Sequence, residues 1–275
     1  MAGSWRIGVC SWSLEAGDVD GLVERVSATG VSSVQLALEP LRLGSMGIEK
    51  TRRRFREAGL SMASGMMAME CEDYSSLASI RETGGLFPDG TWLSNRRAAR
   101  ELAQIAAELG IGLVTFHAGF IPDDPHHPRW DVIVHRLREV AELFGERGTQ
   151  VALETGQESA AALLGVLDVL ARERVGVNFD PGNLILYGSG DPIKALRLLA
   201  PRVMQVHVKD ALPALQAGSW GTEVPVGRGT VDWAALLGGL RQCPEVTALI
   251  IECEAGTERV ADVAEARRFL EAILG

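Results

Sequence analysis

Residues 150–180 read QVALETGQESAAALLGVLDVLARERVGVNFD, and this stretch decides the fold. It begins with a short apolar run, Gln150–Glu154, and ends with a second one, Val175–Asp180. Between them, Glu158–Ala171 repeats apolar residues with the 3.6-residue period of a helix that buries one face. A strand, a helix and a second strand in this order join two parallel strands of one sheet. The stretch therefore predicts a parallel sheet covered by helices.

The same alternation continues toward both ends of the chain. Eight strands are predicted in all, at Arg6–Cys10, Ser33–Leu38, Leu60–Met66, Gly112–His117, Gln150–Glu154, Val175–Asp180, Val203–Val208 and Ala248–Glu252. Amphipathic helices are predicted between and after them, at Asp18–Thr29, Ile48–Ala58, Trp92–Leu109, Asp131–Glu146, Glu158–Ala171, Pro192–Leu199, Asp232–Leu240 and Thr257–Leu274.

Eight strand–helix units in 275 residues fit an α/β fold of one kind, the single (β/α)8 TIM barrel with a closed parallel sheet. We therefore predict one domain over residues 1–275. An open doubly wound sheet is the main alternative, but it usually carries a glycine-rich phosphate loop after its first strand. Ser11–Glu15 follows the first predicted strand and holds no such loop. The one long irregular region, Glu70–Gly90, is predicted to be a functional or mobile loop.

Composition narrows the class of partner. The formal net charge is −9, which disfavours nucleic acid because proteins that follow a phosphate backbone usually carry a basic face. No apolar run approaches the roughly 18 residues of a membrane span. The N-terminal residues lack the pattern of a secretory signal, and the four cysteines form no CxxC pair. We expect a cytoplasmic protein with reduced thiols and no membrane or nucleic-acid partner.

Four polar residues stand at or near the ends of the last four predicted strands: Glu154, Asp180, His207 and Glu252. The carboxyl ends of neighbouring barrel strands meet at one mouth, so these side chains should surround a single point. Three carboxylates there would repel one another without a cation. Separate salt bridges would explain any one of them alone, but the four together favour one divalent ion, Mn, Mg, Co or Zn.

Several segments carry a resemblance to a known family. They are Leu153–Thr155, Asp180–Asn183, His207–Asp210, Gly227–Trp233 and Ile251–Glu252. In this order, at strand ends, the chain resembles the sugar phosphate isomerase/epimerase superfamily, the xylose isomerase-like barrels. The resemblance implies a metal held by Glu154, Asp180, His207 and Glu252. It also implies that Glu154 and Glu252 exchange the substrate proton, as the two glutamates do in ketose 3-epimerases of the family.

The predicted reaction is isomerisation or epimerisation of a small sugar or sugar derivative. A metal ion would stabilise the enediolate that forms when the C–H bond next to the ketone loses its proton. Glu154 and Glu252 would act on opposite faces of the sugar. Loss of a β-hydroxyl at the same site would instead make the protein a keto-sugar or inosose dehydratase. A non-catalytic sugar-binding barrel is a second alternative, and a possible homo-oligomer follows only by analogy.

A DNA repair endonuclease of the related barrel family is disfavoured. That chemistry needs a cluster of several zinc ions and a basic groove. Asn183 stands where a further histidine would be expected, three residues after Asp180, and no DxH pair follows His207.

Four further residues are candidates for substrate binding. His117 ends the fourth predicted strand, where it would bind a hydroxyl, act as a second acid or base, or support a neighbour. Lys209 faces the same side of its strand as His207, where it would polarise the substrate or pair with a carboxylate. Arg228, in a glycine turn, would reach a substrate carboxylate or phosphate or remain solvated. Trp12 would form an apolar wall, as would Trp220, although tryptophan more often packs in a core or rim.

Two more residues lie near the second predicted strand. Gln35 occupies a position where many relatives carry an acidic residue, so substrate contacts cannot be copied from them to this chain. Glu39 lies close by in the sequence and would be able to take that role.

Overall fold

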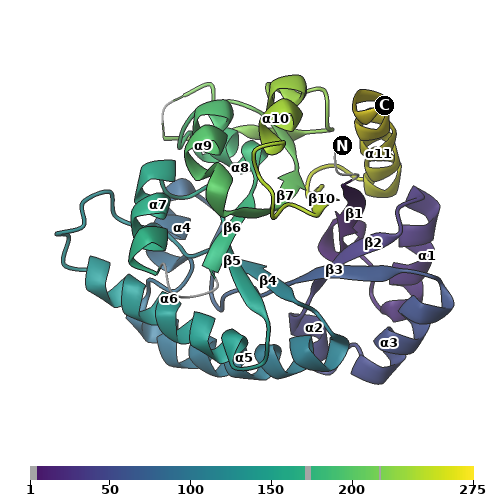
Figure 1. Cartoon of the computed structure of the whole chain (residues 1–275), viewed down its shortest axis with the longest axis horizontal. Coiled ribbons are helices and arrows are strands. Elements are labelled where there is room, and N and C mark those ends of the chain that lie inside the picture. Colours follow the sequence, from purple (N-terminus) through teal and green to yellow (C-terminus); the bar gives the residue numbers. More distant parts are fainter. Residues whose placement is uncertain (1–4, 171–174, 217) are drawn as a thin grey trace.

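The structure is a computed structural model that describes residues 5–170, 175–216 and 218–275. Eight parallel strands close into a barrel in the order β1-β10-β7-β6-β5-β4-β3-β2 (Figure 1). Their bounds are β1 Arg6–Cys10, β2 Ser33–Ala37, β3 Ser61–Met66, β4 Leu113–Phe116, β5 Gln150–Glu154, β6 Val175–Phe179, β7 Val203–Val208 and β10 Ala248–Ile251. The prediction of a (β/α)8 barrel is confirmed, with strand ends that differ by one residue or none.

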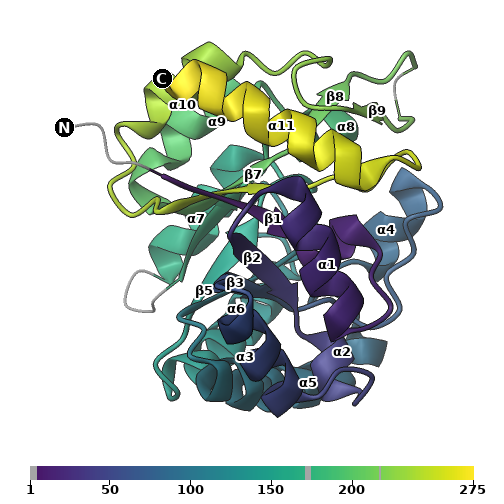
Figure 2. The same cartoon turned by 90° about the vertical axis from the view of Figure 1, so that its right-hand side faces the viewer.

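A helix follows each barrel strand on the outside of the barrel, as predicted. These helices are α1 Val19–Thr29, α3 Ile48–Glu57, α5 Asp89–Leu109, α6 Trp130–Gly145, α7 Ala160–Val169, α9 Pro192–Leu199, α10 Trp233–Leu240 and α11 Arg259–Leu274. The predicted end of α7 at Ala171 lies outside the described residues. Helix α11 packs beside α1, so the last helix meets the first and completes the outer ring (Figure 2).

Local sequence explains where these helices begin and end. Asp18 caps α1 by accepting a hydrogen bond from the Gly21 N–H, and Asp191 caps α9 in the same way. Gly30 ends α1 in the left-handed conformation, with a φ of 76°, which glycine adopts without strain. Among the described residues, no helix has the length and apolar character needed to cross a membrane.

Several short elements were not predicted. They are a 3-10 turn η1 at Ser11–Leu14, the helices α2 Glu39–Arg42, α4 Leu77–Thr83 and α8 Pro181–Tyr187, a second 3-10 turn η2 at Ala200–Arg202 that precedes β7, and the strands β8 Asp210–Leu212 and β9 Thr222–Val224. Helix α4 lies inside the region 70–90, which was predicted to be a loop. Strands β8 and β9 pair antiparallel as a separate hairpin after β7. Three of these elements, η1, α2 and α8, contribute residues to the walls of the pocket described below.

A layer of buried polar side chains fills the barrel below the mouth. Gln35 donates to the Thr115 hydroxyl at 2.7 Å, and Ser64 donates to Gln205 Oε1 at 2.6 Å. The Gln205 amide in turn donates to Gln35 Oε1 at 3.1 Å and to Asn178 Oδ1 at 3.2 Å. Buried polar groups are tolerated when they are hydrogen-bonded to one another in this way. The layer forms a rigid floor for the site above it.

Asp210 organises the segment that follows the hairpin. Its carboxylate accepts hydrogen bonds from the backbone N–H groups of Ala211, Gly227 and Val231 and from the indole of Trp233. A Cβ at Gly229 would lie only 2.0 Å from Asp210 Oδ1, which explains why glycine stands there. The sequence motif Gly227–Trp233 is therefore wrapped around a buried carboxylate.

Candidate metal centre and substrate pocket

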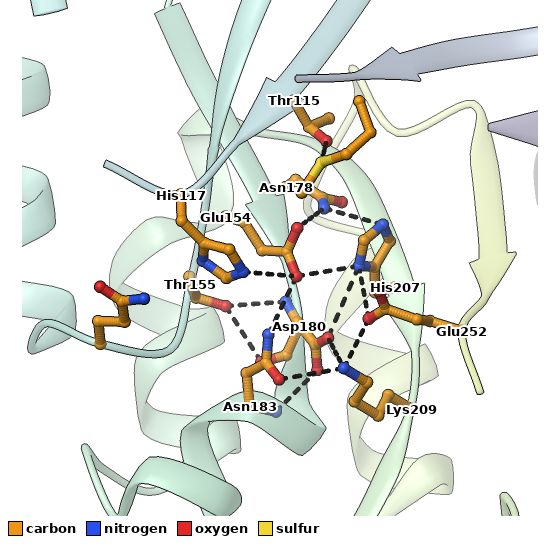
Figure 3. Close-up of polar contacts among 12 residues, drawn as sticks. Thr115, His117, Glu154, Thr155, Asn178, Asp180, Asn183, His207, Lys209 and Glu252 are labelled. Atoms are coloured by element: carbon orange, nitrogen blue, oxygen red, sulfur yellow. Dashed lines mark hydrogen bonds and ion pairs between the residues drawn. The ribbon is translucent and has the colours of Figure 1, made fainter. Parts of the chain in front are cut away.

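Glu154, Asp180, His207 and Glu252 converge at the mouth of the barrel. One ligand atom from each lies within 4.8 Å of the others, and all four residues are buried (Figure 3). Glu154 ends β5, Asp180 directly follows β6, His207 lies in β7 and Glu252 directly follows β10. These four strands are consecutive neighbours in the barrel, so their carboxyl ends meet at the same place. The predicted cluster is present.

His207 turns one ring nitrogen toward the carboxylates and the other toward the floor. Its Nδ1 lies 3.2 Å from Glu154 Oε1 and 3.2 Å from Glu252 Oε2. Its Nε2 lies 2.6 Å from Gln35 Oε1 and 3.0 Å from Asn178 Nδ2. Because Gln35 Oε1 only accepts hydrogen bonds and makes the shorter contact, we assign the proton to Nε2, which donates to Gln35. Nδ1 is then free to offer its lone pair to an ion, because a metal-ligating histidine commonly donates its second N–H to a carbonyl oxygen.

The cluster places three carboxyl groups around one imidazole. Burial raises the pKa of Asp180 to about 7. Burial disfavours the charged form of His207, but Glu154, Cys10, Glu252 and Asp180 together outweigh it and raise the pKa of His207 well above its usual value. A proton on Nδ1 and a dication in the cluster are thus alternative ways of neutralising the same carboxylates.

The geometry of the ligand atoms fits one ion. Asp180 Oδ2 is buried, and no donor in the described part of the chain hydrogen-bonds to it. Two ligands on opposite sides of one ion, at about 2.1 Å each, stand about 4 Å apart, which is close to the spread of this cluster. Three carboxylate oxygens and one imidazole nitrogen suit Mn, Mg, Co or Zn.

Glu154 and Glu252 are held by separate sets of donors. Glu154 Oε1 accepts from the Asn183 amide at 3.0 Å, and its Oε2 accepts from the Asn178 amide at 3.2 Å. Glu252 Oε1 accepts from the Trp12 indole at 2.8 Å, and its Oε2 lies 2.8 Å from Lys209 Nζ. Both carboxylates therefore have fixed orientations at the cluster.

The same contacts shift the pKa values of the two carboxyl groups. Burial opposes the charged form of Glu252, but Lys209 and His207 hold its pKa well below the usual value. For Glu154, the charges of His207 and His117 likewise overcome burial and lower the pKa. Both side chains are thus carboxylates at neutral pH, the form that a general base requires.

A pocket of about 520 Å³ opens above the cluster. Its lining combines carboxylates with aromatic and methionine side chains: Trp12, Ala37, Glu39, Met66, Met67, Ala68, Glu72, Tyr74, His117, Glu154, Asn183, Leu186, Tyr187, Lys209, Trp220, Glu252 and Glu254. Of the four cluster residues, only Glu154 and Glu252 reach this lining. Asp180 and His207 lie behind them.

Three of the four predicted substrate contacts line the pocket: Trp12, His117 and Lys209. His117 Nε2 lies 3.6 Å from Glu154 Oε1. The fourth, Arg228, does not line it. The guanidinium of Arg228 is exposed and pairs with Glu265 on α11 at 3.1 Å, so we leave Arg228 out of the candidate site. Trp220 is in the wall beside Tyr187, with ring centroids 4.7 Å apart.

Other residues took places that the sequence did not predict. Asp180 caps α8 by accepting from the Asn183 N–H, and the Asn183 side chain donates to Glu154 Oε1. Glu72 and Tyr74 enter the pocket from the region before α4. They were not predicted because they lie several residues after the end of β3, and only residues at strand ends were considered. Glu254 also lines it, and its spacing two residues after Glu252 is the one signal that would have pointed to it.

A model of the family described as xylose isomerase-like TIM barrel matches residues 23–273. The crystal structure of a xylose isomerase domain protein from Planctomyces limnophilus has a TM-score of 0.88 and 30% sequence identity to this chain. It covers 98% of this chain and 97% of its own.

Curated relatives are more distant. The probable L-ribulose-5-phosphate 3-epimerase UlaE of Mycoplasma pneumoniae is 24% identical over 179 residues, which is 61% of this chain and 57% of the relative. The inosose dehydratase of Geobacillus kaustophilus is 24% identical over 220 residues, 75% of this chain and 69% of the relative. The chain spans about half the length of the first curated relatives that it matches. With the family match over nearly its whole length, the chain belongs to the xylose isomerase-like TIM barrel family.

Proposed function

We propose that this protein is a divalent-metal-dependent isomerase or epimerase that moves a proton on a small keto sugar. One observation carries the proposal: of the four residues in the metal-ligand cluster, Glu154 and Glu252 alone also line the pocket. An ion ligand does not have to border the substrate, whereas a proton-transfer group does. Glu154 and Glu252 are therefore placed both to bind the ion and to transfer a proton.

The two glutamates stand on different sides of the cluster. Glu154 comes from β5 and Glu252 follows β10, and two barrel strands, β6 and β7, separate them. A sugar bound above the cluster would present one face to each. One carboxylate would remove the proton next to the ketone and the other would return a proton from the far side, which inverts that carbon. Return to the neighbouring carbon would give an aldose instead.

Residues around the pair would support this chemistry. When bound, a divalent ion would supply Lewis-acid stabilisation of the negative charge that develops on the ketone oxygen. Trp12 and Lys209 hold Glu252, while Asn183 and Asn178 hold Glu154, so neither carboxylate must reorient before it acts. His117 borders the pocket next to Glu154, where it would donate to a substrate hydroxyl.

Dehydration is the second candidate. Of the two curated relatives described above, the one that matches the larger share of this chain is an inosose dehydratase. Elimination of water needs an acid for the leaving hydroxyl. Although burial opposes it, the charges of Glu154 and Glu72 raise the pKa of His117, which would let it serve as that acid.

Solvent exchange separates the candidates. The protein is loaded with Mn²⁺ and incubated with a panel of ketoses and inososes in D2O, and NMR follows deuterium uptake. We expect uptake at the carbon next to the ketone and a new sugar of equal mass apart from the deuterium. Glu154→Gln and Glu252→Gln should each slow uptake by about 10²- to 10⁴-fold, and metal content is measured for each variant.

Arg228→Gln removes a charge outside the pocket and should leave exchange unchanged. A product absorbing as an enone or diketone would identify a dehydratase. Metal binding without exchange on any substrate would leave a sugar-binding barrel, and full exchange in both glutamine variants would refute the proton-transfer roles.

A further inference from the structure

The pocket carries little positive charge outside the metal-ligand cluster. Three of its carboxylates, Glu39, Glu72 and Glu254, lie outside that cluster. Lys209 is the one lysine or arginine among the lining residues that the structure describes. A pocket that binds a phosphate or carboxylate group normally offers arginine, lysine or free backbone N–H groups to it.

The charge of Lys209 is already neutralised. Its Nζ lies 2.8 Å from Glu252 Oε2 and 2.9 Å from Glu254 Oε2, and it donates to Asn183 Oδ1 at 3.3 Å. The side chain is 3% exposed. Binding an anion through Lys209 would require breaking buried contacts that hold Glu252 in place, so this ammonium group is a poor anchor for a charged substrate.

Backbone donors beyond β7 are occupied as well. In barrels of this kind, the loops after the last two strands frequently form a phosphate site from their N–H groups and a helix N-terminus. Here the N–H groups of Gly227 and Val231 donate to Asp210, at 2.9 Å and 3.2 Å. The first turn of α10 is capped by Asp232, which accepts from the Ala235 N–H.

In the loop after β10, backbone N–H groups are likewise occupied by a carboxylate of the chain. The N–H groups of Glu254 and Ala255 both donate to Glu223 Oε1, at 2.7 Å and 3.1 Å. Glu223 lies in β9, so the hairpin delivers this carboxylate to the loop. Two internal carboxylates, Asp210 and Glu223, thus each occupy two backbone donors on the loops where an external anion would bind.

We propose that the pocket selects an uncharged polyhydroxylated ketone and rejects the phosphate ester or carboxylate derivative of the same sugar. The inference rests on the proposed function and adds the charge class of its substrate. The chain's own carboxylates occupy two backbone donors on each of these loops, and Glu72 and Glu254 repel a second anion. Hydroxyl groups of a neutral sugar can still bond to these carboxylates and to His117, while the aromatic wall packs against its C–H groups.

Matched substrate pairs test the inference. Exchange in D2O is measured with the Mn²⁺-loaded protein on D-ribulose and D-ribulose 5-phosphate, and on D-fructose and D-fructose 6-phosphate. We expect kcat/KM to be at least about 10-fold higher for the neutral member of a pair that reacts, because like charges oppose binding of the ester. A preference for the ester would overturn the inference while leaving the proposed function intact.

A pair of variants links the preference to the pocket. Glu254→Gln removes a pocket carboxylate and releases one partner of Lys209, so the ester-to-sugar ratio of kcat/KM should rise by about tenfold. Glu265→Gln removes the same charge from α11 outside the pocket and should leave the ratio unchanged. Equal ratios in the wild type and the Glu254 variant would count against the inference.

Binding without turnover keeps the two proposals separate. If no sugar exchanges, the proposed function fails, and isothermal titration of the metal-free protein with inorganic phosphate still tests the pocket. We expect no saturable binding at millimolar phosphate. Saturable binding that Lys209→Met abolishes would overturn the charge selection.

Discussion

His207 and Gln35 meet across the barrel, with His207 Nε2 only 2.6 Å from Gln35 Oε1. Gln35 is itself oriented, because its amide donates to Thr115 at 2.7 Å and its oxygen accepts from Gln205 at 3.1 Å. The contact fixes the proton on Nε2 and directs Nδ1 toward the carboxylates. Gln35 is therefore a positioning residue of the candidate metal centre and is not itself one of the four candidate ligands.

Replacing Gln35 by leucine should weaken metal binding. The change removes the acceptor for the Nε2–H, so the imidazole loses both its orientation and its tautomer. Affinity for Mn²⁺ should fall by about 10- to 100-fold, as it does when partners of metal ligands are removed. Isothermal titration measures the affinity, and the 15N shifts of His207 report the tautomer.

Gln35→Glu is the matched variant for that change. It keeps an acceptor oxygen in place and should retain metal affinity far better than Gln35→Leu. Unchanged affinity in the leucine variant, with an unchanged tautomer, would show that the contact does not position His207.

The sequence located the metal-ligand cluster but gave Gln35 no part in it. Glu154, Asp180 and Glu252 were visible because each is an acid at the end of an apolar run, and a closed barrel brings such ends together. Gln35 is 172 residues away from His207, and their contact depends on how the barrel closes and which way each side chain points. Neither quantity can be derived from a strand pattern alone.

Arg228 was predicted either to reach the substrate or to remain solvated, and the structure places its side chain in solvent, away from the pocket. Glycines on either side predicted a turn near the mouth, and the turn is there, but its arginine reaches outward to Glu265. Asp210 instead takes the backbone donors of that segment, and its role was hidden because a buried carboxylate without a metal has no sequence signature. Helix α4 and the β8–β9 hairpin were missed because they are too short: a helical period is recognised over roughly 11–18 residues and a strand alternation over roughly 4–8.

Removing metal should lower thermal stability. An ion that binds only the folded state stabilises it by about 2.7 kcal/mol at a free concentration 100 times its Kd. For a chain of this size, each kcal/mol shifts Tm by roughly 2–4 °C. EDTA should therefore lower Tm by about 5–10 °C, and added Mn²⁺ should restore it in a calorimetric scan.

Asp180→Asn provides the control for the thermal shift. The substitution keeps the size of the side chain but removes the carboxylate whose Oδ2 has no hydrogen-bond donor among the residues that the structure describes. Its Tm should respond little to EDTA or Mn²⁺. A variant that responds as strongly as the wild type would place the stabilising ion elsewhere.

Lys209→Met should destabilise the metal-free protein. Lys209 and Glu252 are both almost fully buried and lie 2.8 Å apart, so removing the ammonium leaves a buried carboxylate without its partner. Breaking such a pair typically costs about 3–5 kcal/mol. Urea unfolding in EDTA measures the loss, and Lys50→Met, which breaks an exposed pair with Asp20, should cost below about 1 kcal/mol. Equal losses in the two variants would contradict the importance of burial.

Asp89 should make stability depend on pH under acidic conditions. Hydrogen bonds from Arg129 and Arg136 lower the pKa of Asp89 from 3.8 to about 2. Because the folded-state pKa lies below the unfolded one, the stabilisation is fully present above pH 4 and is lost as pH falls toward 2. Asp89→Asn removes this dependence, so the difference in unfolding free energy between the wild type and the variant should shrink over that range. A difference between the wild type and Asp89→Asn that stays constant from pH 5 to pH 2 would mean that the arginines do not favour the charged form of Asp89.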